Sequence, residues 1–332
     1  MSLGNCGPIP ANNGLLATKL NTVECSTRPL PELKPEEVRI QVEVSMVSPG
    51  TELHHITGTH TKKSEFPRAT GYISVGKVVG AGGAVSESLM GQRFLVQQNH
   101  FAFHNADPKR LRAIPEGVDP VDGCTAILLG ISLRGIRGGQ VRIGDSVVVF
   151  GLGVIGLYAL HLAKVAGAYP VIGVDPVKLR RDVAQKMGAD FVLDPINSDA
   201  PAEIRKLTDG EGARVSIDAS GTPKVIAGLP DVTAEFGKVV VLGGIHGTVP
   251  MDLYTRFQKS NLTMVGCGSS YPQDYPYDER RNEISLLQMI AAGMVRPRPA
   301  ITDIVPWRKG PEIYQRMIFE KDKIIGAAFD WR

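Results

Sequence analysis

The sequence is poor in cysteine and has no excess of one charge. Its 332 residues include four cysteines, Cys6, Cys25, Cys124 and Cys267, and none of them has CxxC spacing. Scattered thiols argue against a disulfide framework and a cysteine-rich structural zinc lobe, and they favour a reducing compartment. The 37 basic and 34 acidic residues leave a net charge of +3, with no basic block. A nucleic-acid partner is therefore not expected.

A targeting segment and a membrane span are also missing from the sequence pattern. The first residues show no basic region followed by an apolar core, so no signal peptide is expected. The longest apolar stretch, around 146–163, contains three glycines and is followed by Lys164. A membrane helix needs about 20 predominantly apolar residues. We expect a cytoplasmic protein without a membrane partner.

What is present fits two globular domains, because 332 residues with 43% hydrophobic content can bury sizeable cores. Residues 38–46 alternate strictly between apolar and polar, which predicts a half-buried strand. Further strands are expected at 72–80 and 93–97. The first third of the chain is thus predicted to be an all-β module.

From Pro120 onwards the pattern changes to alternating helices and strands. This alternation predicts a doubly wound parallel α/β sheet with right-handed crossovers. The expected strands cover 146–150, 171–174, 215–218, 238–242 and 262–265, and a further strand ends near Leu193. The expected helices cover 125–136, 154–167, 178–187, 200–208, 223–235 and 280–292.

The most informative motif is Val-Val-Val-Phe-Gly-Leu-Gly-Val-Ile-Gly at 147–156. It places a Gly-x-Gly-x-x-Gly turn between a buried strand and a helix, which is typical of dinucleotide binding. Gly151 permits the tight turn, Gly153 lets the backbone approach a pyrophosphate, and Gly156 lets the helix pack on the strand. The free N–H groups at the helix start would face the anion.

An acidic residue, Asp175, ends the next apolar run, 24 positions after Gly151. A carboxylate there can accept hydrogen bonds from both ribose hydroxyls and would repel a 2′-phosphate, so NAD is predicted. NADP stays open, because Lys178, Arg180 and Arg181 follow closely; a solvated helix face is the other interpretation of these cations. The predicted cofactor-binding residues here are Gly151, Leu152, Gly153, Val154, Ile155, Gly156 and Asp175.

Over essentially its whole length the chain resembles the medium-chain dehydrogenase/reductase superfamily. The resemblance rests on the Pro-Gly-Thr-Glu-Leu-His-His turn at 49–55, the Gly-Tyr strand opening at 71–79, and the Val-Val-Val-Leu-Gly-Gly strand at 239–244. The sequence looks most similar to a zinc-free branch with bacteriochlorophyllide dehydrogenases and sugar-linked two-domain oxidoreductases. The resemblance implies a GroES-like catalytic domain at 1–120 and 270–332, and a Rossmann domain at 121–269.

The resemblance also implies where zinc ligands would lie. Zinc alcohol dehydrogenases of the superfamily use Cys, His-Glu and a third Cys or acid. This sequence has Pro49 at the first of these positions, Tyr72-Ile73 at the second and Ile127-Leu128 at the third. Pro, Ile and Leu cannot coordinate zinc, and Tyr is a rare ligand. No metal site is therefore expected.

Without zinc, the residues that the resemblance places in the relay must handle the proton. Thr51 and His54 match a hydroxyl and a histidine that carry the proton to solvent in zinc enzymes, and Tyr72 would put a phenol near the substrate oxygen. The predicted catalytic residues are Thr51, His54 and Tyr72. Alternatively, Tyr72 only fills the vacated metal cavity, Thr51 is a turn hydroxyl and His54 is a surface histidine.

Several residues are candidates for contacts with substrate or nicotinamide. By the resemblance, the strand end with Gly243, Gly244 and Ile245 lies beside the nicotinamide, and His246 follows it. Glu52 would hold Tyr72 or a substrate hydroxyl, or have no role. Arg281 and Asn282 would recognise substrate hydroxyls or cap a helix. The predicted substrate residues are Glu52, His246, Arg281 and Asn282.

The sequence therefore predicts a zinc-independent, NAD-dependent oxidoreductase. It would interconvert a secondary alcohol and a ketone on a small polyol, sugar or cyclitol-like substrate. Two alternatives stay open: an NAD(P)H-dependent quinone or enone reductase, and a catalytically silent nicotinamide-binding regulator. By analogy with the superfamily, a homodimer or higher homo-oligomer would pair the strand at 262–265.

Overall fold

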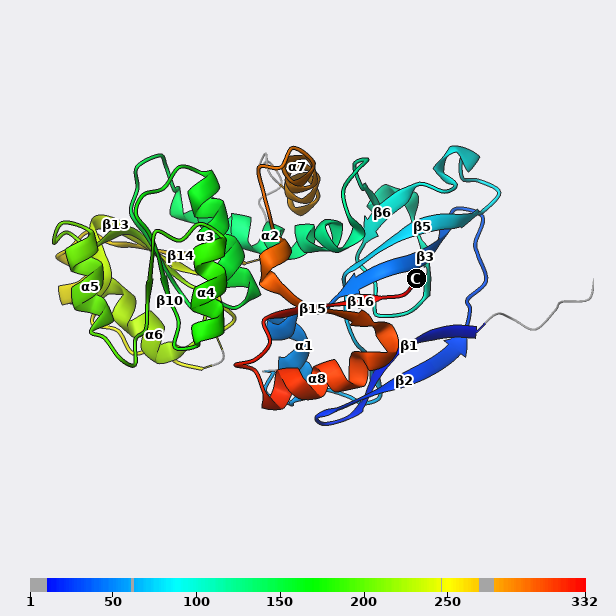
Figure 1. The fold of residues 1–332 in the computed structure, drawn as a ribbon, viewed down its shortest axis with the longest axis horizontal. Coiled ribbons are helices and arrows are strands. Elements are labelled where there is room, and N and C mark those ends of the chain that lie inside the picture. The colour runs from blue at the N-terminus through cyan, green and yellow to red at the C-terminus, as the bar shows by residue number, and fades with distance from the viewer. Residues whose placement is uncertain (1–10, 61–62, 246, 269–277) are drawn as a thin grey trace, which may run out of the picture. The chain divides into compact units, whose positions relative to one another are not determined.

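The computed structural model describes residues 11–60, 63–245, 247–268 and 278–332. The chain divides into two compact units (Figure 1). The first unit consists of Met1–Cys124 and Asp303–Arg332, and the second of Thr125–Thr302. Across the described ranges, no helix is long and apolar enough to cross a membrane.

The first unit is built on two antiparallel sheets and two helices. The small sheet has the order β2-β1-β4, and the large one has the order β15-β16-β3-β5-β6-β8, with β7 paired to β3. The bounds are β1 Ala11–Lys19, β2 Thr22–Pro29, β3 Val38–Met46, β4 Arg68–Ala69, β5 Ser74–Ala81, β6 Arg93–Val96, β7 Phe103–Ala106, β8 Arg112–Ala113, β15 Ile301–Pro306, β16 Gly326–Asp330, α1 Pro49–Ile56 and α8 Gly310–Phe319.

Alternation in the sequence sets the faces of the large sheet. In β3, Val38, Ile40 and Val44 are fully buried, while the intervening polar side chains point the other way. On the α8 side, Tyr314 packs with Leu15 and Phe329 in one apolar cluster. This cluster anchors α8 beside the small sheet and α1.

The second unit is a six-stranded parallel sheet in the order β11-β10-β9-β12-β13-β14. Numbered from the first strand, this is the 3-2-1-4-5-6 order of a doubly wound nucleotide-binding sheet, so the predicted fold class is confirmed. The bounds are β9 Val147–Phe150, β10 Val171–Val174, β11 Phe191–Leu193, β12 Ala213–Asp218, β13 Thr233–Val241, β14 Thr263–Gly266, α2 Pro120–Gly139, α3 Val154–Val165, α4 Lys178–Lys186, α5 Ala200–Leu207, α6 Pro223–Gly228 and α7 Glu279–Ala291.

Two element boundaries differ from the sequence prediction. The helix expected at 223–235 stops at Gly228, because a short turn containing Pro230 follows and β13 already begins at Thr233. The helix expected at 125–136 begins earlier, at Pro120, where the carboxylate of Asp119 accepts a hydrogen bond from Val121 N at 2.8 Å.

The tail after 270 also divides differently from the expected catalytic domain. Residues 278–302 belong to the second unit, whereas the resemblance implies that they belong to the catalytic domain. Side-chain contacts explain this: Arg134 on α2 lies 3.4 Å from Glu279 on α7, and Arg137 donates to Asn282. Further along, Arg296 N donates to His161 Nε2 at 3.0 Å. These polar contacts tie the segment to α2 and α3.

Candidate active site

The glycine turn after β9 has the geometry that the motif predicts. Gly151 has φ +86°, a conformation that L side chains rarely adopt. A Cβ on Gly156 would lie 1.8 Å from Gly151 O, so only glycine fits there. No atom lies within 4 Å of a Cβ placed on Gly153, which leaves open space where a pyrophosphate would approach. The turn therefore fits a dinucleotide, with Leu152 and the helical Val154 and Ile155 between its glycines.

The acid at the end of β10 braces this turn. The Asp175 side chain is only 2% exposed, and its Oδ2 accepts from Leu152 N at 2.8 Å while Oδ1 accepts from Val177 N at 2.8 Å. Arg180 Nη1 lies 3.5 Å from Oδ2. Each carboxylate oxygen has a second lone pair, so the contact of Asp175 with ribose stays a prediction.

The other cations after Asp175 are engaged with different acids. Lys178 Nζ lies 2.7 Å from Asp182 Oδ2, and Arg181 Nη2 lies 2.9 Å from Asp194 Oδ2. These pairs favour the solvated helix face over a 2′-phosphate site for Lys178 and Arg181.

The loop after β12 packs against the glycine turn, and this contact was not predicted from the sequence. The buried Asp218 accepts from Ser220 N at 3.0 Å, from Ser220 Oγ at 2.6 Å and from Gly221 N at 3.1 Å. Burial raises the pKa of Asp218, against the lowering effect of these donors. A Cβ on Gly151 would lie 2.7 Å from Ser220 N, so the two loops touch. The signal was available as an Asp-Ala-Ser-Gly run directly after a buried strand.

The loop after β13 completes this edge of the sheet. A Cβ on Gly221 would lie 2.3 Å from Gly244 O, and one on Gly243 would lie 2.5 Å from Gly221 N. The predicted residues Gly243 and Gly244 therefore pack directly on the β12 loop, and Ile245 follows them. His246 lies outside the described residues, as do the tyrosines at 271–277. The loops after β9, β10, β12 and β13 thus lie together at the carboxyl ends of the parallel strands. In doubly wound sheets, ligands bind at this edge.

In the first unit, helix α1 and the residue after Gly71 carry the candidate proton-handling groups. The Tyr72 hydroxyl donates to Ser48 Oγ at 2.8 Å. Thr51 is exposed in the first turn of α1, and His54 Nδ1 lies 2.8 Å from Thr59 Oγ1. Ser48 was not among the predicted residues; it immediately precedes the Pro49-Gly-Thr-Glu run. The roles of Thr51, His54 and Tyr72 in chemistry stay predictions.

Glu52 is buried beneath these groups and ties them together. Only 6% of its side chain is exposed, and its carboxylate accepts from Ser48 N at 2.7 Å and from Gly71 N at 2.9 Å. The Tyr314 hydroxyl on α8 also donates to it. Burial and the negative charge of Glu52 raise the pKa of Tyr314 well above its usual value, so that phenol stays a donor. These contacts favour a bracing role over the predicted alternative of binding a substrate hydroxyl.

A fully buried histidine extends this network. His100 Nδ1 lies 2.8 Å from Ser45 Oγ, and its Nε2 lies 3.5 Å from Glu52 Oε2. Trp331 Nε1 donates to the same Ser45 Oγ at 2.9 Å. A Cβ on Gly71 would lie 2.4 Å from the His100 ring, so the chain before Tyr72 passes directly over it. The backbone on both sides of the Tyr72–Ser48 pair is therefore fixed by buried polar groups.

The remaining predicted substrate residues lie in the first turn of α7, where Arg137 of α2 and the helix cap Asp278 contact them. Asn282 is 1% exposed and accepts a hydrogen bond from Arg137 on α2, and its contact with substrate stays a prediction. The backbone N–H of Arg281 donates to the Asp278 carboxylate at 2.7 Å, which caps the start of α7. The cap is thus Asp278 rather than the predicted pair.

The zinc that the superfamily implies does not fit the donor set. Pro49 has no side-chain donor, and the hydroxyl of Tyr72 is bonded to Ser48. Within the described part of the chain, no group of three or more His, Cys, Asp or Glu side chains could hold a metal ion. Zinc independence nevertheless stays a prediction.

Comparisons with known proteins agree with this architecture. Residues 154–282 match the family of zinc-binding dehydrogenases. The chain is 32% identical over 213 residues to D-guloside 3-dehydrogenase of Escherichia coli (strain K12), a match covering 63% of this chain and 61% of that protein. It is 27% identical over 322 residues to L-threonine 3-dehydrogenase of Caldanaerobacter subterraneus subsp. tengcongensis, covering 86% and 90% of the two chains.

Solved structures show the same fold. A Sinorhizobium meliloti 1021 protein assigned as a zinc-binding dehydrogenase and bound to NADP superposes with a TM-score of 0.84 at 20% identity, covering 97% of this chain and 99% of that one. The chain therefore has the fold of the medium-chain alcohol dehydrogenases, and the sequence matches support its place among them. The zinc-free branch stays a prediction.

Proposed function

We propose that this chain is a zinc-independent, NAD-dependent oxidoreductase that interconverts a secondary alcohol and a ketone on a polyol, sugar or cyclitol-like substrate. The observation that carries the proposal is the edge of the parallel sheet where the Gly151 turn, Asp175 and the β12 and β13 loops meet. The names of the relatives, a guloside 3-dehydrogenase and a threonine 3-dehydrogenase, support a hydroxylated substrate.

The second unit would hold the cofactor. The open space at Gly153 and the free N–H groups at the start of α3 suit a pyrophosphate, and Asp175 suits an unphosphorylated ribose. When bound, the nicotinamide supplies the acceptor or donor of a hydride. NAD rather than NADP is favoured by the negative charge of Asp175, although a structural neighbour binds NADP.

The first unit would handle the proton that leaves or joins the substrate oxygen. Tyr72 would turn its O–H from Ser48 Oγ, 2.8 Å away, to that oxygen when the ketone is reduced; in the other direction it would accept the alcohol proton as a phenolate, to which the Ser48 hydroxyl can donate. Thr51 and His54, both on α1, would pass the proton to solvent. Glu52 positions this set because it binds Ser48 N and Gly71 N on either side.

Zinc has no role in this proposal. A catalytic zinc needs about three protein ligands and an open position, and Pro49 and Tyr72 replace two of the expected ligands. The phenol and its buried supports stand in their place.

The protein is further proposed to act in the cytoplasm as a homo-oligomer. β14 lies at the end of the described sheet order, and Met264 on it is 42% exposed. An open edge of this kind can pair with a second copy.

The direct test is NAD reduction, followed by nicotinamide absorbance, with a panel of sugar alcohols, glycosides and cyclitols. We expect turnover with at least one member and a preference for NAD over NADP. Turnover only of conjugated enones with NADH or NADPH would support the reductase instead. NADH binding without turnover of either panel would support the regulator.

A further inference from the structure

A polar cavity lies at the opposite end of the parallel sheet from the glycine turn. Its volume is about 140 Å³, and all its lining residues belong to the second unit: Gly139, Gln140, Arg142, Asp145, Arg214, Val215 and Lys238. Val215 of β12 pairs with Val147, the first residue of β9, and with Lys238 of β13. Val147 lies three residues, or about 10 Å along the strand, before Phe150, which leads into the glycine turn.

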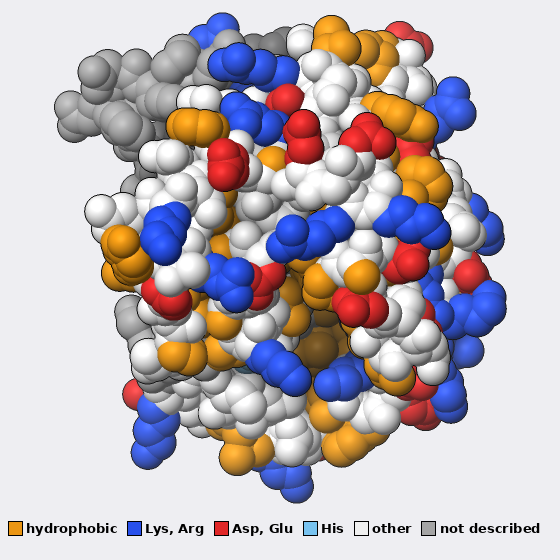
Figure 2. Space-filling model, turned by 90° about the vertical axis from the view of Figure 1, so that its left-hand side faces the viewer, with side chains coloured by type: hydrophobic (Ala, Val, Ile, Leu, Met, Phe, Trp, Pro, Cys, Tyr) orange, Lys and Arg blue, Asp and Glu red, His pale blue; other side chains and the backbone are white. Residues whose placement is uncertain are grey.

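Three cations from three separate segments line this cavity. Arg142 comes from the loop before β9, Arg214 from β12 and Lys238 from β13. Within the described residues, none of the three forms a salt bridge. Figure 2 shows that acidic and basic side chains are otherwise mixed over one face of the protein. Arg142 and Arg214 are exposed and Lys238 is half-buried, so water screens these charges, and an anion that replaced the water would neutralise them.

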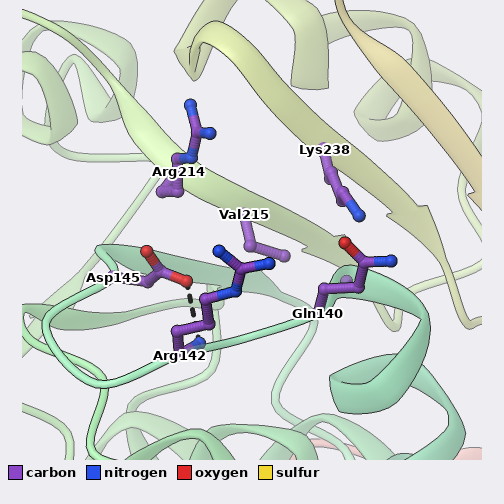
Figure 3. Close-up of a pocket in the computed structure, with 7 residues that line it drawn as sticks. Gln140, Arg142, Asp145, Arg214, Val215 and Lys238 are labelled. Carbon is purple, nitrogen blue, oxygen red and sulfur yellow. Dashed lines mark hydrogen bonds between the residues drawn. The ribbon is translucent and has the colours of Figure 1, made fainter.

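The arrangement of the side chains leaves room between donors. Figure 3 shows the Arg142 guanidinium between Asp145 and Gln140, with the Lys238 side chain reaching towards Gln140. Arg214 is fixed by Nη1 donating to Glu235 O at 3.1 Å. The one acid, Asp145, accepts from Arg142 N at 2.8 Å through Oδ2, so it serves the turn before β9.

The electrostatics of Lys238 agree with an anion site. Burial lowers the pKa of Lys238, and the positive charges of Arg142 and Arg214 lower it further. An anion in the cavity would reverse the effect of the two arginines. The cavity is several times larger than the roughly 15 Å³ that one water needs, so an oxyanion with accompanying water fits.

We propose that this cavity binds a small phosphate-bearing anion, held by Arg142, Lys238 and the Gln140 amide. A guanidinium offers two parallel N–H donors and an ammonium adds a point charge, a combination that suits the several oxygens of a phosphate group. The site is separate from the proposed dinucleotide site, because it lies at the other end of the same strands. The phosphate group belongs either to free inorganic pyrophosphate or to a nucleotide.

The test is calorimetric titration of the whole protein with inorganic pyrophosphate at constant ionic strength, without and with saturating NADH. We expect binding in both conditions. Lys238→Gln and Arg142→Gln should each weaken it at least about tenfold. Lys238→Arg should retain most of it. The matched control is Lys206→Gln, which removes one charge from an exposed position on α5 in the same unit and should change nothing.

A parallel titration with ADP identifies the source of the phosphate. If, in the presence of NADH, ADP binds more tightly than pyrophosphate and is weakened by the same two variants, the ligand is a nucleotide. The proposal is overturned if pyrophosphate does not bind, if NADH abolishes its binding, or if Lys238→Gln and Arg142→Gln bind it as the control does. None of these outcomes depends on turnover, so they are distinct from a failure of the proposed oxidoreductase function.

Discussion

Replacing Glu52 by glutamine should strongly destabilise the first unit. The carboxylate accepts from two backbone N–H groups, of Ser48 and Gly71, and from the Tyr314 hydroxyl. A glutamine of the same shape has one acceptor oxygen, so its NH₂ group must face one of the two backbone N–H donors. A buried donor without a partner costs about 1–3 kcal/mol, and the remaining bonds lose the contribution of the charge. We therefore expect a loss of about 2–4 kcal/mol in the free energy of unfolding.

The fluorescence of tryptophan suits this measurement, because both tryptophans, Trp307 and Trp331, lie in the first unit. They stack with their ring centroids 5.0 Å apart. In urea, where the slope is about 2 kcal/mol per molar, Glu52→Gln should lower the midpoint of unfolding by about 1–2 M. The control, Glu24→Gln, removes an exposed carboxylate on β2 and should leave the midpoint unchanged. Equal midpoints for both variants would refute the bracing role of Glu52.

Three further predictions follow from the geometry. Gly156→Ala should weaken NADH binding at least about tenfold in a fluorescence titration, because its Cβ would lie 1.8 Å from Gly151 O. Burial lowers the pKa of His104 from 6.5 to about 4, so below pH 6.5 only the unfolded chain gains this proton. The unfolding free energy should therefore fall by about 3 kcal/mol between pH 6.5 and 4 from this residue. Tyr72→Phe combined with His54→Ala should lower kcat by about a hundredfold or more, with NADH affinity unchanged.

Two of these predictions have a matched comparison variant, and all three have a result that would contradict them. For the glycine turn it is Gly228→Ala, a helical position where no atom lies within 4 Å of the added Cβ; equal NADH affinity of the two variants would contradict the packing argument. For the pH profile it is His104→Asn, measured by tryptophan fluorescence, which should flatten the dependence; an unchanged profile would remove His104 as its cause. For the relay, full turnover by the double variant would show that other groups move the proton.

The sequence predicted the second unit well, because its signals are local. The glycine turn, Asp175 and the buried runs around them each report directly on a strand end or a tight turn. The exception was the segment at 223–235, where helix-forming residues precede Pro230 and the helix stops early. The start of α2 was also missed, since its cap at Asp119 precedes the apolar periodicity.

The polar network of the first unit could not be predicted, because its members are distant in sequence. Glu52 meets Tyr314 across 262 positions, and Trp331 meets Ser45 across 286. Such contacts depend on how the last helix and strand return to the first sheet. Similarly, α7 packs in the second unit through the hydrogen bond between Asn282 and Arg137, which are 145 positions apart. Hydrophobic periodicity in the sequence does not predict such a contact.

The proposed activity is the oxidation of a secondary alcohol with NAD and without zinc. The most direct test measures NAD reduction, with the best substrate of the panel, in protein that has been treated with chelator and freed of metal as verified by elemental analysis. We expect the same kcat before and after treatment, with no gain when zinc is added back. Loss of turnover on chelation, restored by a stoichiometric amount of zinc, would contradict it.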